Sequence, residues 1–595
     1  MCGILGQVSQ NIDESFFVEN LKKLNHRGPD NSSTVIYENL ILGHTRLSII
    51  DLDSRSDQPF ELDNFSIVFN GEIYNYLELK EELVQYGMTF KTNSDTEVIL
   101  NAYKFWGEEF LNKMNGMWSF VIYDKYKETI ILSRDRFGVK PLYYYLSEDA
   151  FIFSSEIKSI LPYLKLKAVS RKEIIRYLIY GAQEHREETL FLGIKRFPKG
   201  SIGKYNLKSK TLKIREFYHL KTGSNVHTEI DVVKKNLRRK LDQSVKIRLR
   251  SDVEVAIALS GGIDSNIITF ISNNINNNLK SFTATYLNAK EINENNLTDK
   301  TVKKLALNHV YKEVNIDEYI DKLEKIIWYH DEPFDTMGMI AQFSVFQSMK
   351  ENNVKVSLDG QGADEIFGGY KNYMVCIIKK HFFNPFFHYK YFSANDFNQI
   401  INNYKLFLVS LFPSLFERLY FKKRARKVFN NSIKFISSKK KMFEYPSNLN
   451  AKLNYDIDEH LPVLLKYADR NSMANSVESR APFMDYNLIN YSIDVSPNLK
   501  FKNGYLKYIL RETFDSHIDE NIIWNKLKKG FPVPQKEWLD DERLIKKFNT
   551  FINASVILKK LNINMNLDRS NPIYWRIINL AIWEKTFEVT IDENY

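Results

Sequence analysis

A change of pattern near residue 226 divides the chain into two parts that fold by different rules. Before it, residues 1–160 read as short apolar or alternating strands separated by turns, with helices expected near 75–87 and 94–106. After it, helices alternate with apolar strands, beginning with a helix over 228–249 and the strand VEVAIALS. Such alternation is typical of a parallel sheet covered by helices on both faces. We therefore predict an α+β sandwich followed by an α/β part built on a parallel sheet.

Three segments complete this division. Residues 161–225 look like a connector, in which IKRFPKGSIGKYN carries Pro and Gly and is followed by the strand-like TLKIREFYHL. The turns YENL, FNGE and YDKYKE are expected to break strands before it. The segment 376–455 is aromatic and basic, and the tail after 456 reads mostly helical. The first domain is placed at 2–215, connector included, and the second at 226–595, with about 376–455 as a helical insertion.

Composition excludes several classes of protein. A chain of 595 residues with 44% hydrophobic and 26% charged residues is globular, and its two cysteines exclude a disulfide scaffold or a cysteine-rich zinc domain. No signal peptide is visible, and the run LFLVSLFPSLF is shorter than the roughly 20 residues of a membrane span, so we expect a cytoplasmic protein. The net charge of +10 is partly local, at KKRARK and KKK, so nucleic-acid binding is not expected.

A glycine-rich turn at 259–265 follows the first strand of the second part and opens a helix. Glycine lets backbone N–H groups approach a phosphate, and the helix N-terminus adds favourable partial charge. The aspartate of this turn is placed to hold Mg²⁺ on a pyrophosphate, and its two serines add hydroxyl donors. An ordinary strand–turn–helix corner is the competing interpretation. The candidate phosphate-binding residues are Ser260, Gly261, Gly262, Asp264 and Ser265.

The second residue of the chain is a cysteine. Removal of Met1 would leave the Cys2 thiol beside its own α-amine, which titrates near pH 8 and can act as the base for the thiol. A small buried residue is the alternative interpretation of Cys2 alone. Five motifs then follow in order: MCGILG, HRGPD, GHTRLSIID, FNGEIYN and SDTEVIL.

Together these motifs resemble the class II glutamine amidotransferase domain, which has an N-terminal-nucleophile fold. The resemblance implies that Cys2 attacks the glutamine amide, while the Asn70 side chain and the Gly71 N–H form the oxyanion hole. It also implies that Arg46 and Asp95 hold the α-carboxylate and α-amine of glutamine. Glu72 completes the expected glutamine-binding set.

The turn at 259–265 resembles the SGGxDS signature of the ATP pyrophosphatases, and a second loop, DGQGADEIFGGY at 359–370, follows another apolar strand. With the first domain, these features resemble the glutamine-hydrolysing asparagine synthetase family from Cys2 to about Trp538, including matches at 461–485 and 528–534. The resemblance implies ATP and Mg²⁺ as cofactors and a buried ammonia path between the domains. The implied roles are adenine contact for Leu259 and Ala284, pocket lining for Asp359 and Gly360, Mg²⁺ binding for Asp264 and Asp364, and stabilisation of the departing pyrophosphate for Lys528.

One loop departs from the family pattern. Asparagine-forming members usually read S-G-[D/E]-G-x-D-E, whereas here Gln361 replaces the acid and Asp359 replaces the small residue. An amide cannot act as a base or pair with an ammonium. The acceptor is therefore aspartate, which we place first, or another carboxylate such as a sugar uronic acid of a bacterial surface polysaccharide.

Other classes of function remain to be weighed. A cyclase of the β-lactam synthetase type usually lacks a working glutaminase, so Cys2, Asn70 and Asp95 argue against it. The intact phosphate loop and Lys528 argue against a catalytically inactive relative. A helical cap is favoured over a membrane-surface helix for 376–455, so membrane association is not expected, and a homodimer is left open.

Overall fold

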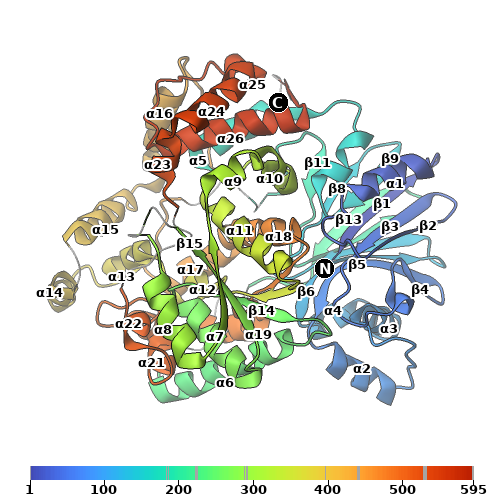
Figure 1. Cartoon of the computed structure of the whole chain (residues 1–595), viewed down its shortest axis with the longest axis horizontal. Coiled ribbons are helices and arrows are strands. Elements are labelled where there is room, and N and C mark those ends of the chain that lie inside the picture. Colours follow the sequence, from blue (N-terminus) through green and yellow to red (C-terminus); the bar gives the residue numbers. More distant parts are fainter. Residues whose placement is uncertain are drawn as a thin grey trace.

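The computed structural model describes residues 2–592 except 182, 183, 185, 221–225, 287, 288, 290, 291, 395, 396, 439–441 and 527–532. Two stacked antiparallel sheets form the first part of the chain (Figure 1). In order across the first sheet, the strands are β11 (Ile194–Arg196), β8 (Tyr143–Leu146), β9 (Ala150–Ser154), β1 (Gly3–Ser9), β3 (Leu40–Arg46) and β2 (Asn31–Ile36). In the second they are β13 (Thr211–Glu216), β12 (Ser201–Asn206), β7 (Thr129–Arg134), β6 (Gly116–Asp124), β5 (Phe65–Ile73) and β4 (Phe60–Leu62).

The two sheets are held together by alternate apolar side chains. Ile4 of β1 and Leu42 of β3 meet Val68 of β5 and Val121 of β6 in one buried cluster. Since side chains alternate between the faces of a strand, residues of this kind at every second position bury one face of each sheet. Helices α2 (Tyr76–Gln85) and α3 (Asp95–Trp106) lie where the sequence predicts them. The predicted α+β sandwich is confirmed.

Two predictions about this part are wrong. The FNGE motif does not turn the chain, because residues 69–72 lie inside strand β5 and pair with β6 throughout. Residues 161–225 are not merely a connector, since they supply β11 to the first sheet and β12 to the second, beside β13, which lies in the strand-like TLKIREFYHL as predicted. Of the residues that suggested a connector, Pro198 and Gly200 lie between β11 and β12, and Gly203 lies within β12. They therefore interrupt neither sheet.

A five-stranded parallel sheet forms the centre of the second part, as predicted. Its strand order is β16 (Asn308–Glu313), β15 (Lys280–Thr285), β14 (Val255–Ala258), β17 (Val356–Leu358) and β18 (Glu478–Arg480). Val255 and Ile257 share a core with α6 (Ile230–Arg248) and α7 (Ile263–Ile275), whereas Ala256 packs with α11 (Gly338–Glu351). Helices therefore cover both faces of β14.

Helices dominate the rest of the chain, and its last described strand returns to pair with a strand near residue 169. The tail runs through α18 (Leu461–Met473) and ends with α26 (Pro572–Phe587) and β19 (Thr590–Asp592), which pairs in parallel with β10 (Ala168–Ser170). Helices α13 (Met374–Lys380), α14 (Pro385–Ala394), α15 (Phe397–Val409) and α16 (Pro413–Val428) occupy much of the predicted insertion, and α14 and α15 project on the side opposite the two antiparallel sheets (Figure 1). Among the described helices, none has the length and apolar character needed to cross a membrane.

Candidate active sites

Cys2 lies at the start of β1, buried against the middle of β5. Its backbone N–H donates a hydrogen bond to Asn70 Oδ1 at 3.2 Å, and its carbonyl accepts one from Arg27 Nε at 3.0 Å. Burial raises the pKa of the Cys2 thiol above its ordinary value. A thiol of this kind needs a base close by before it can attack.

Strand β5 presents a free backbone edge beside Cys2. The N–H groups of Phe69 and Ile73 point away from β6, because they donate to Gln58 Oε1 and to Asp95 Oδ2 at 2.9 Å. Since backbone groups alternate along an antiparallel strand, the Gly71 N–H between them faces the same edge. A Cβ at Gly71 would lie 2.2 Å from the Met117 carbonyl oxygen, so only glycine fits. The edge therefore offers a backbone donor next to the thiol.

The charged residues predicted to hold glutamine gather around this edge, but they are already tied to the protein. Arg46 donates to the carbonyls of Ile50, Asp51 and Asp53 and to the Asp57 carboxylate at 2.7 Å. Burial raises the pKa of Asp95 to about 6. Glu72 lies on the same face of β5 as Asn70 and pairs with Arg480 of the second part at 3.3 Å. The structure thus brings all the predicted glutaminase residues together.

The phosphate loop lies at the carboxyl end of β14, as predicted. Gly262 is the N-cap of α7 and makes no side-chain cap, while Ser260 and Ser265 bond each other through their hydroxyls at 3.0 Å. The Gly261 N–H donates to Glu294 Oε2 at 2.9 Å. A carboxylate therefore sits on one of the donors that a phosphate oxygen would use.

Two predicted metal ligands meet on one lysine that the sequence analysis missed. Lys507 Nζ lies 2.6 Å from Asp264 Oδ2 and 2.6 Å from Asp364 Oδ1, and its side chain is almost fully buried. A pair of carboxylates already gathered around a cation has the oxygen donors that Mg²⁺ prefers, with phosphate oxygens completing its shell. Within the described ranges no group of three or more His, Cys, Asp or Glu residues is placed to hold a metal by itself. The donor set fits a cation held jointly with a nucleotide.

A cavity of about 1770 Å³, its open mouth included, joins the two glycine-rich loops. Gly360 of the second loop packs directly against the phosphate loop. A Cβ at this position would lie 2.9 Å from the Asp264 Cβ and 3.0 Å from the Ser265 nitrogen. Asp359 is buried in its wall, where burial raises the pKa of the carboxyl to about 6 despite hydrogen bonds from Ser479 and from the Gln361 N–H. The remaining predicted lining residues are Leu259, Ser260, Gly262, Asp264, Ser265, Ala284 and Asp364. Lys528 lies outside the described residues.

Strand β18 stands between the two sites. Its Glu478 and Arg480 side chains form an ion pair at 2.5 Å, and Arg480 also contacts Glu72 of the glutaminase side. Ser479 points the opposite way and donates to Asp359 of the nucleotide cavity. Because neighbouring side chains of a strand point to opposite faces, three residues form a wall that touches both sites.

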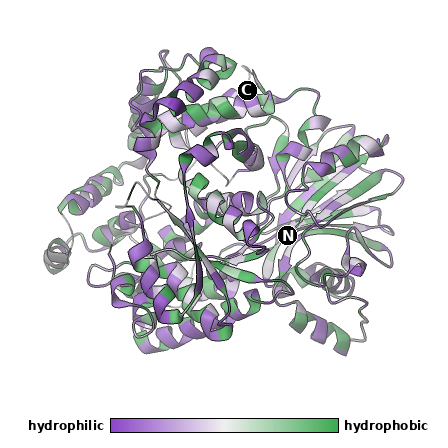
Figure 2. Cartoon of the chain, viewed as in Figure 1, coloured by the Kyte–Doolittle hydropathy of each residue, from purple (hydrophilic) through white to green (hydrophobic). Residues whose placement is uncertain are grey.

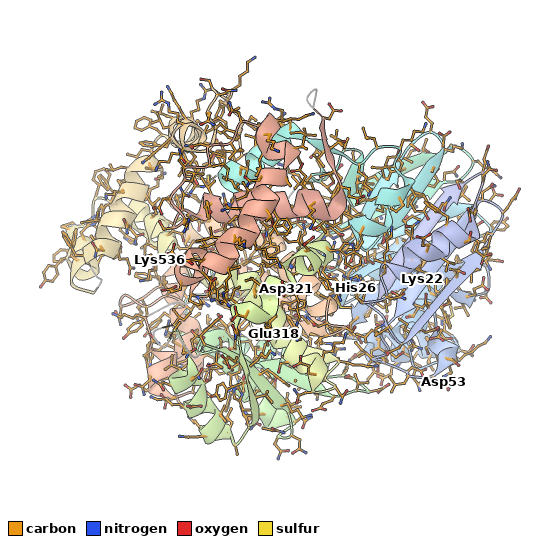
Figure 3. All side chains as sticks on the ribbon, turned by 45° about the horizontal axis from the view of Figure 1, so that its top comes forward. Lys22, His26, Asp53, Glu318, Asp321 and Lys536 are labelled. Carbon is orange, nitrogen blue, oxygen red and sulfur yellow. The ribbon has the colours of Figure 1, made fainter. Side chains whose placement is uncertain are left out.

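A buried ionic network joins the two parts next to this wall. Arg27 pairs with Glu156 at 2.7 Å and with Asp469 of α18 at 2.9 Å, and Lys140 reaches the same Asp469 at 3.3 Å. His26 lies at the boundary between the first part and the helices of the second (Figure 3), and its carbonyl accepts from Ser476. The sequence motif at 461–485 marked this segment, but nothing in it showed which charges face the other domain.

The fold and the gathered residues define a two-domain amidotransferase class. Residues 1–218 match a family described as glutamine amidotransferase domain, and residues 236–569 match one described as asparagine synthase. The chain belongs to the asparagine synthase family, and the expected glutamine-hydrolysing synthetase type of enzyme is confirmed at that level.

Its relatives carry more than one name. The chain is 31% identical to asparagine synthetase [glutamine-hydrolyzing] 1 of Bacillus subtilis, over all of this chain and 98% of that protein. It is 26% identical to amidase chyE of Penicillium rubens, over 87% of this chain and 84% of that protein. A solved Bacillus subtilis glutamine phosphoribosylpyrophosphate amidotransferase shares 14% identity over 60% of this chain and 75% of that one, with a TM-score of 0.28, which is too low to carry an argument.

Proposed function

We propose that the chain hydrolyses glutamine at Cys2 and uses the ammonia to amidate a carboxylate that ATP has activated in the second cavity. The observation that carries this proposal is the wall of β18, which places residues of one strand in both sites. Two half-reactions that exchange a volatile intermediate gain from such adjacency, because ammonia released into water is lost.

The first half-reaction follows from the pocket around Cys2. The α-amine freed by removal of Met1 takes the thiol proton, Sγ attacks the amide carbon, and the C–N bond breaks to release ammonia. The negative charge on the amide oxygen is met by the Gly71 N–H at the free edge of β5 and by Asn70 Nδ2. Asn70 Nδ2 makes a long hydrogen bond of 3.4 Å to Ser119, while Asn70 Oδ1 accepts from the Cys2 N–H. Water then hydrolyses the thioester to glutamate.

The second half-reaction belongs to the nucleotide cavity. The acceptor carboxylate attacks the α-phosphorus of ATP, the bond to the β-phosphate breaks, and pyrophosphate leaves. Ammonia then attacks the acyl carbon and AMP departs. Asp264 and Asp364 would hold Mg²⁺, which neutralises phosphate charge when bound. When Mg²⁺ binds these two carboxylates, Lys507 would leave them or contact the phosphate oxygens of ATP. We retain Lys528 as the lysine that stabilises the departing pyrophosphate.

Aspartate is the acceptor we propose first. Asp359 is buried in the cavity wall with a pKa near 6, so at pH 7 it is largely ionised and can pair with the ammonium of an amino-acid substrate. Gln361 cannot take this role, because its amide carries no charge. A sugar uronic acid has no ammonium and would leave Asp359 with its hydrogen bonds from Ser479 and Gln361 but no cationic partner.

The test compares acceptors directly. Purified protein with glutamine and Mg-ATP is given aspartate or a uronic acid, and AMP and the amide product are measured. Aspartate-dependent AMP with stoichiometric asparagine supports the proposal, and Asp359→Asn should then raise the KM for aspartate by at least about tenfold. Glutamate release without aspartate-dependent AMP would reject aspartate while leaving the glutaminase assignment intact.

A further inference from the structure

Residues 371–428, which contain α13 to α16, carry most of the net charge of the chain. They contain eleven Lys and Arg residues against two acids, Asp396 and Glu417, so this tenth of the sequence has a formal charge of +9 out of +10. Glu417 accepts hydrogen bonds from the backbone N–H and the hydroxyl of Ser438, which hold its carboxylate against the protein. A local excess of this size creates a positive potential at one end of an otherwise nearly neutral molecule.

The same segment exposes large aromatic side chains at its tip. Phe383 is 93% exposed, Phe386 79% and Phe397 71%, and we call residues 382–397, as far as they are described, the aromatic tip. The segment also has a hydrophobic core of its own, in which Ile378, Tyr391 and Phe407 are buried. The exposed rings of the tip are additional to this core. The tip therefore presents surplus apolar area to its surroundings.

Helix α16 combines the two properties on one face. Leu415 and Leu419 are 54% and 50% exposed, and Lys422, Lys423 and Arg426 continue the same face one turn after another. Hydrophobic and hydrophilic residues are interleaved along α15 in Figure 2. The base of the segment reaches the nucleotide site, where Met374 and Gln399 line a pocket with Asp264, but the exposed rings of the tip and the leucines of α16 do not line it. The long basic side chains can reach anionic headgroups while the neighbouring leucines and the aromatic rings contact the apolar edge of the headgroup region.

Against the expectation from the sequence that this segment is a helical cap without membrane association, we propose that the aromatic tip and the exposed face of α16 form a docking surface for an anionic lipid bilayer. The charge of the segment selects anionic headgroups, which attract Lys and Arg within a Debye length. The aromatic rings then enter the headgroup region, where amphipathic and aromatic side chains are favoured. The surface is independent of the proposed chemistry, so the chain can bind bilayers whichever carboxylate it amidates.

Co-sedimentation of the full chain with vesicles tests the proposal. We expect binding to phosphatidylcholine vesicles that contain phosphatidylglycerol at low salt, little binding to pure phosphatidylcholine, and loss of binding at about 0.5 M salt. Phe383→Ser with Phe386→Ser should weaken binding at least about tenfold, and so should Lys422→Gln with Lys423→Gln and Arg426→Gln. The matched controls are Tyr126→Ser with Leu166→Ser, and Lys208→Gln with Lys303→Gln and Lys304→Gln, which change exposed residues elsewhere.

Insertion is read separately at the tip. In Phe386→Trp, anionic vesicles should shift the added tryptophan emission to shorter wavelength, relative to the unmodified chain. The proposal is overturned by absence of binding at low salt, by tip variants that bind like their controls, or by equal binding to neutral vesicles. It is also overturned if the tip instead mediates a dimer in sedimentation velocity, or if DNA but not vesicles binds. Glutaminase activity should be unchanged in every variant.

Discussion

The glutaminase pocket and the nucleotide cavity hold their charged groups in opposite ways. Around Cys2, backbone groups hold much of the charge: Arg46 donates to three carbonyls as well as to the Asp57 carboxylate, and Asp95 accepts from the Ile73 N–H. In the cavity, Asp264 and Asp364 are held by a single side-chain ammonium. Backbone bonds fix a geometry, whereas an ion pair can exchange one cation for another. The first pocket is therefore built in advance for its substrate, and the second is arranged to be completed by a nucleotide and its metal.

The largest expected effect separates the two pockets. Cys2→Ala should lower glutamine-dependent amide formation about 10,000-fold or more, because it removes the thiol that is proposed to attack the glutamine amide. Ammonia-dependent amide formation should remain close to normal. The assay supplies glutamine or ammonium chloride and measures AMP. If both activities fall together while the protein stays folded, the pockets are not separate.

The reciprocal change is Asp264→Asn. Pyrophosphate formation should fall about 1,000-fold, since an amide loses the charge that holds Mg²⁺ against phosphate oxygens. Glutaminase activity in the same preparation is the internal control and should persist. Normal pyrophosphate release would remove Asp264 from the metal site.

The difference between fixed and exchangeable charges is sharpened by Lys507→Met. Removing the ammonium leaves two carboxylates facing each other, so the free energy of unfolding should fall by about 3 kcal/mol. Mg²⁺ with ATP should restore more stability to this variant than to the unmodified chain, as measured by thermal unfolding. Lys300→Met, which breaks a partly exposed pair with Asp519, is the matched control. If Mg-ATP raises the unfolding temperature of both proteins equally, Mg²⁺ and the Lys507 ammonium do not occupy the same position between the two aspartates.

A smaller effect is expected from pH at the glutaminase pocket. Because the pKa of Asp95 is raised to about 6, the carboxylate is lost as pH falls through that value, and the kcat/KM for glutamine should drop about tenfold per unit below it. The fold responds with the opposite sign: between about pH 4 and 6 the folded chain binds this proton and the unfolded chain does not, so Asp95 lowers stability as pH rises there. Asp95→Asn should be poorly active and lack this inflection. An unchanged inflection in the variant would assign it to another group.

The smallest effect concerns the rim of the contact between the two parts. Glu78 pairs with Arg250 at 2.6 Å, but the glutamate side chain is 54% exposed. Glu78→Gln should therefore change the free energy of unfolding by less than about 1 kcal/mol, in contrast to the buried network around Asp469. Thermal unfolding at low and high salt measures this. A loss comparable to that of a buried pair would show that the rim contributes more than exposed ion pairs usually do.

Local sequence was enough for the elements and the loops, and it failed where distant residues meet. Cys2 and the turn at 259–265 were found because each motif is contiguous. Lys507 could not be found, because nothing in LKYILRE indicates that its lysine reaches two acids more than 140 residues away. FNGE was misassigned since Asn and Gly favour turns, whereas here the need for a close approach to Met117 selects the glycine inside a strand. Lys528 remains a prediction.

Strand β18 is only three residues long, and its pairing with β17 decides which chemistry each residue serves. Glu478 lies opposite Val356, Ser479 opposite Ser357 and Arg480 opposite Leu358. A slip of one residue would turn Ser479 toward the glutaminase and drive a charge into the nucleotide cavity, because the faces of a strand exchange with every step. The pairing register of β18 with β17 thus determines which side chains face the glutaminase pocket and which face the nucleotide cavity. A residue inserted within the paired strand, in contrast to one inserted in the loop before it, would exchange these two faces.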